Sequence, residues 1–185
     1  MEQHVFGARK PMLIQANIVS FADSPHTLLS NLAIGPPNFS NTNGLCVWLL
    51  SSNQLSALRG NFKQAPGANI LSKPRISTAE GIQADLFVGQ SLPPGSPAKQ
   101  VGLEFRCCAR FRRNSSDLLT HISFSEFVTN ENDGSASTPP FTTTLQTNID
   151  TALRLQLPKG NGVFFLDQSH HESPRKNIGV LIDPL

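Results

Sequence analysis

The stretch from Ala68 to Pro93, ANILSKPRISTAEGIQADLFVGQSLP, decides the fold that the rest of the chain is expected to adopt. It holds two short extended segments, Ile70–Ile76 and Ala84–Val88, which are separated by the polar turn Ser77–Gln83. Pro74 has no N–H and keeps the residue before it out of the helical region, so the first segment is predicted to lie at a sheet edge or at a bulge. The whole stretch therefore predicts a β-hairpin.

The segments before this stretch predict strands and one short helix. Met12–Phe21 is apolar on both faces, which is typical of a strand buried on both sides. Leu45–Leu50 is a continuous apolar run of strand length. Ser51 followed by Gln54 matches a capping box, and the apolar residues after it recur at helical spacing. We expect a helix near Ser52–Lys63, stabilised by docking this apolar side onto a sheet.

The most regular alternation in the chain lies in Val101–Arg113. Every second residue from Val101 to Phe111 is apolar, and the residues between them are mostly polar. Such a period of two predicts a strand with one apolar face and one polar face. The polar face carries Glu104, Arg106, Arg110 and Arg112. This face could line a polar lumen, bind an anion or lie in solvent as an ordinary charged surface.

Further extended segments complete the chain. Leu118–Val128 follows a polar turn and is expected to form a hairpin with Val101–Arg113. Phe141–Leu157 alternates as one long strand, a Gly-rich turn follows it, and Val163–Leu166 returns. Asn177–Pro184 is a closing apolar strand. Periodicity fits equally a barrel shared between copies and a monomeric sandwich whose strands pack one face on a core.

Composition supports a mainly β fold and excludes some partners. The 185 residues include 14 Pro and 13 Gly, which indicates many turns. Charged residues make up only 15% and the formal net charge is +2, so no nucleic-acid partner is expected. No apolar run reaches the length of a membrane helix. The opening residues, MEQHVFGARKPM, lack the apolar core of a signal peptide, so we expect a fragment or a truncated start if the protein is exported.

Taken together, these segments resemble the secretin domain of the multimeric outer-membrane channels that serve bacterial type II and III secretion and type IV pili. The resemblance is carried by a short helix, Ala-Asn-Ile-Leu-Ser-x-Pro-Arg-Ile-Ser-Thr, an apolar return strand, Val-Gly-Gln-x-Leu-Pro and a long strand that opens on Val-Gly-Leu. It covers nearly the whole chain, and the loops at 92–100 and 167–175 depart from it. The structural residues of the family pattern are Asn69, Pro74, Arg75, Val88, Gly89, Gln90, Pro93, Val101, Gly102, Gly160 and Pro184.

The resemblance implies a mainly β fold with one short helix, in which long amphipathic antiparallel strands and hairpins contribute to a multimeric β-barrel. Residues 1–185 would form a single secretin-like domain. Residues 1–11 would be a flexible lead-in, 12–93 the strand, helix and hairpin part, and 101–185 the long strands. The implied function is that of a non-catalytic subunit of a channel for protein or pilus export. The implied location is the bacterial outer membrane or periplasm, and the implied partners are identical copies in a ring and other secretion-system components.

Two other functions stay open from the sequence. A reduced, stand-alone β domain would keep the fold for assembly or binding without a pore. A hydrolase or metal enzyme would use His170, His171 and Glu172, but adjacent His residues in a strand point apart and no further Cys or His cluster supports them. Cys107 and Cys108 are adjacent, and the odd total of three Cys does not predict a disulfide framework. We predict no catalytic, cofactor-binding or metal-ligating residue.

Overall fold

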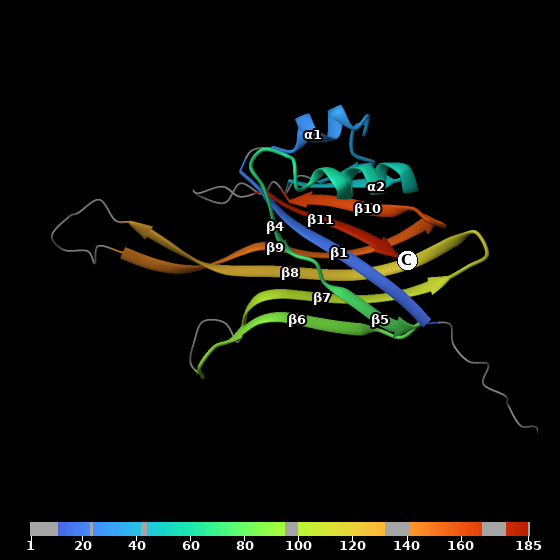
Figure 1. Ribbon diagram of the computed structural model, residues 1–185. Coiled ribbons are helices and arrows are strands. Elements are labelled where there is room, and N and C mark those ends of the chain that lie inside the picture. The colour runs from blue at the N-terminus through green and yellow to red at the C-terminus, as the bar shows by residue number, and fades with distance from the viewer. Residues whose placement is uncertain are drawn as a thin grey trace, which may run out of the picture.

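The computed structural model describes residues 11–22, 24–41, 44–94, 100–131, 141–167 and 177–184, and at 111, 126–131 and 141–149 it describes the backbone alone. The lead-in expected at 1–11 therefore lies outside the described residues except for Pro11, which begins the first strand. Within the described ranges the elements, in chain order, are β1 (Pro11–Phe21), α1 (His26–Asn31), β2 (Phe39–Ser40), β3 (Leu45–Leu50), α2 (Ser52–Asn61), β4 (Ala68–Ser72), β5 (Arg75–Ala79), β6 (Ala84–Ser91), β7 (Gln100–Phe111), β8 (Ser115–Glu131), β9 (Phe141–Pro158), β10 (Gly162–Asp167) and β11 (Asn177–Pro184) (Figure 1).

These strands form two antiparallel sheets in the part of the chain that the structure describes. Sheet A comprises β1–β5, β10 and β11, in the order β2-β3-β10-β11-β1-β4, with β5 also paired to β1. Sheet B comprises β6–β9, each paired with the next along the chain. The first and last parts of the described chain thus build sheet A together, and sheet B is inserted between β5 and β10. The prediction of a mainly β fold is confirmed.

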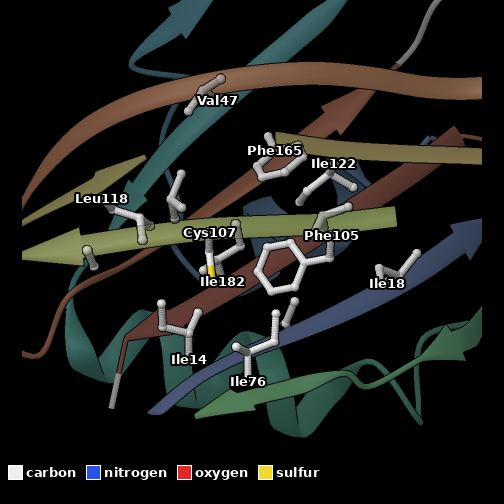
Figure 2. Close-up of a cluster of buried hydrophobic side chains, with 14 of the residues drawn as sticks. Ile14, Ile18, Val47, Ile76, Phe105, Cys107, Leu118, Ile122, Phe165 and Ile182 are labelled. Atoms are coloured by element: carbon white, nitrogen blue, oxygen red, sulfur yellow. The ribbon is translucent and has the colours of Figure 1, made fainter. Parts of the chain in front are cut away.

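The two sheets pack face to face, and the helices cover the other face of sheet A (Figure 1). Alternation along β1 explains why both of its faces are apolar: Ile14 and Ile18 belong to the core between the sheets, whereas Phe21 belongs to the core beneath the helices. Figure 2 shows Phe105 and Cys107 of β7 among side chains of sheet A. The amphipathic strands of sheet B therefore use their apolar face within this chain.

The predicted helix is present as α2. Ser51 accepts a hydrogen bond from the backbone N–H of Gln54, and the N–H of Ser51 donates one to the side-chain oxygen of Gln54. Leu55 and Leu58 are buried against sheet A, so tertiary packing holds this ten-residue helix. The expectation of one short helix is incomplete, because the structure adds α1, a six-residue helix that Leu29 anchors in the same core.

The hairpin predicted within Ala68–Pro93 is wrong, because its turn passes from one sheet to the other. The turn between β5 and β6 does not pair them, since β5 pairs with β1 and β6 pairs with β7. The turn at Pro158–Gly162 likewise joins β9 in sheet B to β10, which pairs with β3 and β11 in sheet A. Glycines with φ of +73° at Gly81 and +78° at Gly160 permit the reversals. Turn residues of this kind serve a hairpin and a crossing equally well.

Pro74 lies at a sheet edge beside an irregularity, as the sequence predicts. The Pro74 carbonyl accepts a hydrogen bond of 3.0 Å from the Ala16 N–H of β1. Without an N–H it cannot return the second bond, so the edge strand is interrupted between β4 and β5. The register against β1 also shifts between Ile18 and Val19.

One end of sheet B extends past the rest of the molecule. The pairing of β7 with β8 ends at Gly102 opposite Ser125, but β8 and β9 stay paired as far as Glu131 opposite Phe141. Figure 1 shows this ribbon reaching beyond both sheets. At the opposite end lie the β7–β8 turn, the β9–β10 connection and the end of β11 (Figure 1).

Candidate functional site

The face of sheet B that points away from sheet A carries most of the sheet's charged side chains together with the exposed Phe87 and Leu119, and we call it the open face. Of the residues that the sequence assigned to a possible lumen face, the structure places Glu104, Arg106 and Arg110 here, and Arg112 follows β7 in the turn and pairs with Asp117 of the same face. The alternate residues of β7, including Phe105 and Cys107, are buried between the sheets. Because successive side chains of a strand point to opposite faces, β7 contributes one face to the buried core and the other to a charged surface.

Ion pairs organise the charges of the open face. The Nε of Arg106 donates to Glu104 over 2.6 Å, and the same guanidinium lies 3.7 Å from the Asp85 carboxylate of β6. The Nε of Arg112 donates to Asp117 of β8 over 2.9 Å. Exposed pairs of this kind contribute about 0–1 kcal/mol each to stability. Their main consequence is a hydrated wall in which both signs of charge are interspersed.

Sequence reasoning missed the members of this face that come from β8 and β9. His121 is placed beside Arg106 by the β7–β8 register, and its Nε2 lies 2.8 Å from the Asp150 carboxylate of β9. Residues an even number apart in a strand share a face, so the sequence already indicates that Asp117 and His121 of β8 lie on the same one. The pairing to β7 and β9 could not be obtained without the register.

Two phrases of the family pattern meet across β6 and β7. Gly89, from Val-Gly-Gln, lies directly opposite Gly102, from Val-Gly-Leu. Gly102 has a φ of +140°, which side chains rarely adopt, and a Cβ built there would lie 2.6 Å from the Cα of Gly89. A Cβ at Gly89 would in turn lie 2.9 Å from the Cα of Gly102. The glycines therefore allow an approach of the two backbones that no other residue permits.

The other residues of the family pattern are spread over the fold and do not converge on a site. The Asn69 carbonyl of β4 accepts a bond of 3.4 Å from the Ser20 hydroxyl, and Arg75 of β5 donates to the Gln15 side chain over 3.0 Å. Pro93 is exposed after β6, whereas Pro184 is buried at the end of β11 opposite Ile14. Val88, Gln90 and Val101 lie in the β6–β7 ladder around the paired glycines.

The cysteines and the possible metal ligands are the reactive groups to consider in the part of the chain that the structure describes. Burial raises the pKa of the Cys107 thiol to about 12, helped by the neighbouring Cys108 and Asp85, so this thiol is a packing group and not a nucleophile. Burial also raises the pKa of Cys46. The described residues contain no group of three or more His, Cys, Asp or Glu side chains placed to hold a metal ion. His170, His171 and Glu172 lie outside the described residues.

Comparisons with known proteins find similarity among solved structures alone. No family model matches the sequence, and no curated protein matches it. In structure, the chain is similar to the type II secretin GspD of enteropathogenic Escherichia coli, with a TM-score of 0.43 and 15% identity over 95% of this chain and 69% of that one. It is similar to the type II secretin XcpQ of Pseudomonas aeruginosa, with a TM-score of 0.46 and 14% identity over 95% of this chain and 58% of that one. Among the described residues, no helix is both long and apolar enough to span a membrane.

Proposed function

We propose that this chain is a structural subunit of a multimeric secretion channel at the bacterial outer membrane, and that it performs no catalysis. The observation that carries the proposal is the four-stranded antiparallel sheet B, which has a dry face, a charged face and two unsatisfied edges among the described strands. Copies of the chain would form a ring that exports protein or pili together with other secretion-system components. The sequence resemblance to secretins supports the same function.

The edges of sheet B are the strongest physical support for a ring. β6 pairs only with β7 and β9 pairs only with β8 in the described chain, so each offers one row of unpaired N–H and C=O groups. Such edges template pairing with another chain unless they are protected. On β6, Phe87 and Val88 are also exposed apolar side chains. Pairing β6 of one copy with β9 of the next is a heterologous contact, and repetition with closure gives a ring without edges.

The charge of the open face supports the proposal that this face borders a water-filled lumen. Placing one Arg at the middle of a bilayer costs about 2–4 kcal/mol in a β-barrel. Arg106 and Arg110 lie on this face with Arg154 of β9. In a ring built from sheet B, the open face would therefore line the aqueous interior, whereas the dry face stays packed on sheet A.

An edge-blocking variant with a matched control tests the ring. Val88 on the edge strand β6 and Leu119 on the inner strand β8 are each 50% exposed, so Lys at either position adds the same charge to an equally accessible site. A charge on an edge strand opposes strand addition, and a charge on an inner strand leaves the edges intact. The measurement is molecular mass in mild detergent by light scattering.

We expect the unaltered chain and Leu119→Lys to form a large ring, and Val88→Lys to run near the 20.1 kDa of one chain. The circular dichroism spectra of all three should be alike. A single 20.1 kDa species for the unaltered chain, in detergent as in plain buffer, would count against the channel.

That monomeric outcome would favour the second candidate, a stand-alone β domain with an assembly or binding role and no pore. One observation favours it. The single chain already buries an apolar core between the sheets and a second one under the helices, so its fold does not depend on a partner for a core. A monomer that keeps cooperative unfolding in plain buffer is its expected behaviour.

A further inference from the structure

We infer that a cavity between α2 and the ends of both sheets is a binding site for a phosphate-type anion. The cavity has a volume of about 820 Å³, within the range of ligand sites. It lies at the end of the molecule opposite the β8–β9 ribbon, where both connections between the sheets and the β7–β8 turn come together (Figure 1). This inference stands apart from the ring, because a single chain contains the whole site.

The charge of the lining favours anions. Its cationic side chains are Arg59, Arg112, Arg113 and Lys159, against the carboxylates Glu80 and Asp183. Asp183 is buried and forms an ion pair with Arg59, while Arg112 pairs with Asp117. Within the described ranges, Arg113 and Lys159 form no ion pair. Two of the four cations thus border the cavity outside any ion pair of the described residues, and the lining carries two more cations than carboxylates.

Unused hydrogen-bond donors give the cavity a second feature of an anion site. The Nε of Arg59 is buried and has no hydrogen-bond partner among the described residues. Serine hydroxyls from α2 and from the start of β8 complete the lining: Ser52, Ser56, Ser115 and Ser116. Guanidinium, ammonium and hydroxyl donors around one volume suit the several acceptor oxygens of a phosphate or pyrophosphate group.

Backbone hydrogen bonds hold these donors in place before any ligand arrives. The Arg112 N–H donates to the Ser115 carbonyl over 2.7 Å, which closes the β7–β8 turn. The Lys159 N–H donates to the Asn114 carbonyl over 3.1 Å, which fixes the β9–β10 connection against that turn. Arg113 and Lys159 are therefore presented from two connected backbones. A bound anion would bridge sheet B to α2 and to the end of sheet A.

The test uses the full chain and inorganic pyrophosphate, with binding measured by isothermal titration calorimetry. Arg113→Gln removes an unpaired cation from the cavity, and Arg154→Gln is the matched control because Arg154 lies on the open face of β9. We expect saturable binding that Arg113→Gln weakens about tenfold, the effect of losing one charge-assisted hydrogen bond. Arg154→Gln should change the affinity by less than about twofold, and Lys159→Gln should repeat the loss.

A second arm separates free phosphates from lipid headgroups. Vesicles of phosphatidylcholine, with and without phosphatidylglycerol, are sedimented with each variant. Binding of pyrophosphate alone identifies a soluble ligand, and phosphatidylglycerol-dependent sedimentation that Arg113→Gln abolishes identifies a headgroup. If neither probe binds, or if Arg113→Gln and Arg154→Gln lose binding equally, the attraction is only that of general positive charge and the inference is overturned.

Discussion

The contact between Gly89 and Gly102 gives the sharpest prediction about the fold. We expect Gly102→Ala to destabilise the protein, because a Cβ at this position would lie 2.6 Å from the Cα of Gly89. The backbone φ of +140° is also one that Ala rarely adopts. Both effects act on the same pair of strands, so the variant forces β6 and β7 apart or bends them.

The magnitude follows from these two effects. A non-glycine residue in such a backbone region costs about 1–3 kcal/mol, and forcing extra volume into a packed contact costs about 1–3 kcal/mol. Because β6 is an edge strand and can move, we expect the total to be about 2–4 kcal/mol. At about 2–4 °C per kcal/mol for a domain of this size, the Tm should fall by roughly 10 °C.

Thermal unfolding followed by circular dichroism measures the loss, and amide hydrogen exchange locates it. Exchange should accelerate most in Ala84–Ser91 and least in the inner strand β8. Gly60→Ala is the control, since nothing lies within 4 Å of a Cβ at Gly60 and Ala favours the helix by about 0.5–1 kcal/mol. If Gly102→Ala were as stable as the unaltered chain, the close approach of the two strands would be refuted.

Three further predictions concern the helix, the core and the buried thiol. Ser51→Ala removes the hydroxyl that accepts from the Gln54 N–H and should cost about 1 kcal/mol in urea unfolding, whereas an unchanged midpoint would exclude the cap as a stabilising group. Phe105→Ala empties the centre of the core between the sheets and should cost about 3–5 kcal/mol in the same assay, and a loss below about 1 kcal/mol would contradict that packing. The folded-state pKa of Cys107 is raised from 9.0 to about 12, so the stability gained by keeping the thiol neutral is complete below pH 9 and is lost as pH rises toward 12. Cys107→Ala should flatten this alkaline loss in unfolding measured from pH 8 to pH 11, and an unaltered slope would show that other groups cause it.

The strands could be predicted from the sequence because burial leaves a local pattern. From Leu103 to Ala109 every second side chain is buried in the core, and the alternation of Leu103, Phe105 and Cys107 with mostly charged residues is visible in the sequence. The capping box at Ser51 is equally local. Helix α1 has no comparable sequence pattern, because it has six residues, no side-chain cap and one buried residue, Leu29.

Partners across the sheets could not be predicted, because pairing is a non-local choice. Ile76 and Leu86 flank the same turn and both pack in the core between the sheets, yet they belong to different sheets. The same reason hid part of the open face: Arg106 was predicted on it from β7 alone, but His121 and Asp150 join it through register. The cavity at α2 was beyond reach for the same reason, since its cations come from separate elements.

The two connections between the sheets tie sheet B to sheet A at one end of the molecule. Both crossings, at Ala79–Ala84 and Pro158–Gly162, lie at the end that carries the cavity, and the β8–β9 ribbon projects from the opposite end. A pull on that ribbon would reach sheet A through two covalent tethers side by side, and would open the core progressively from the free end. The end that carries both connections would open last, so unfolding under force would begin at the end from which the β8–β9 ribbon projects.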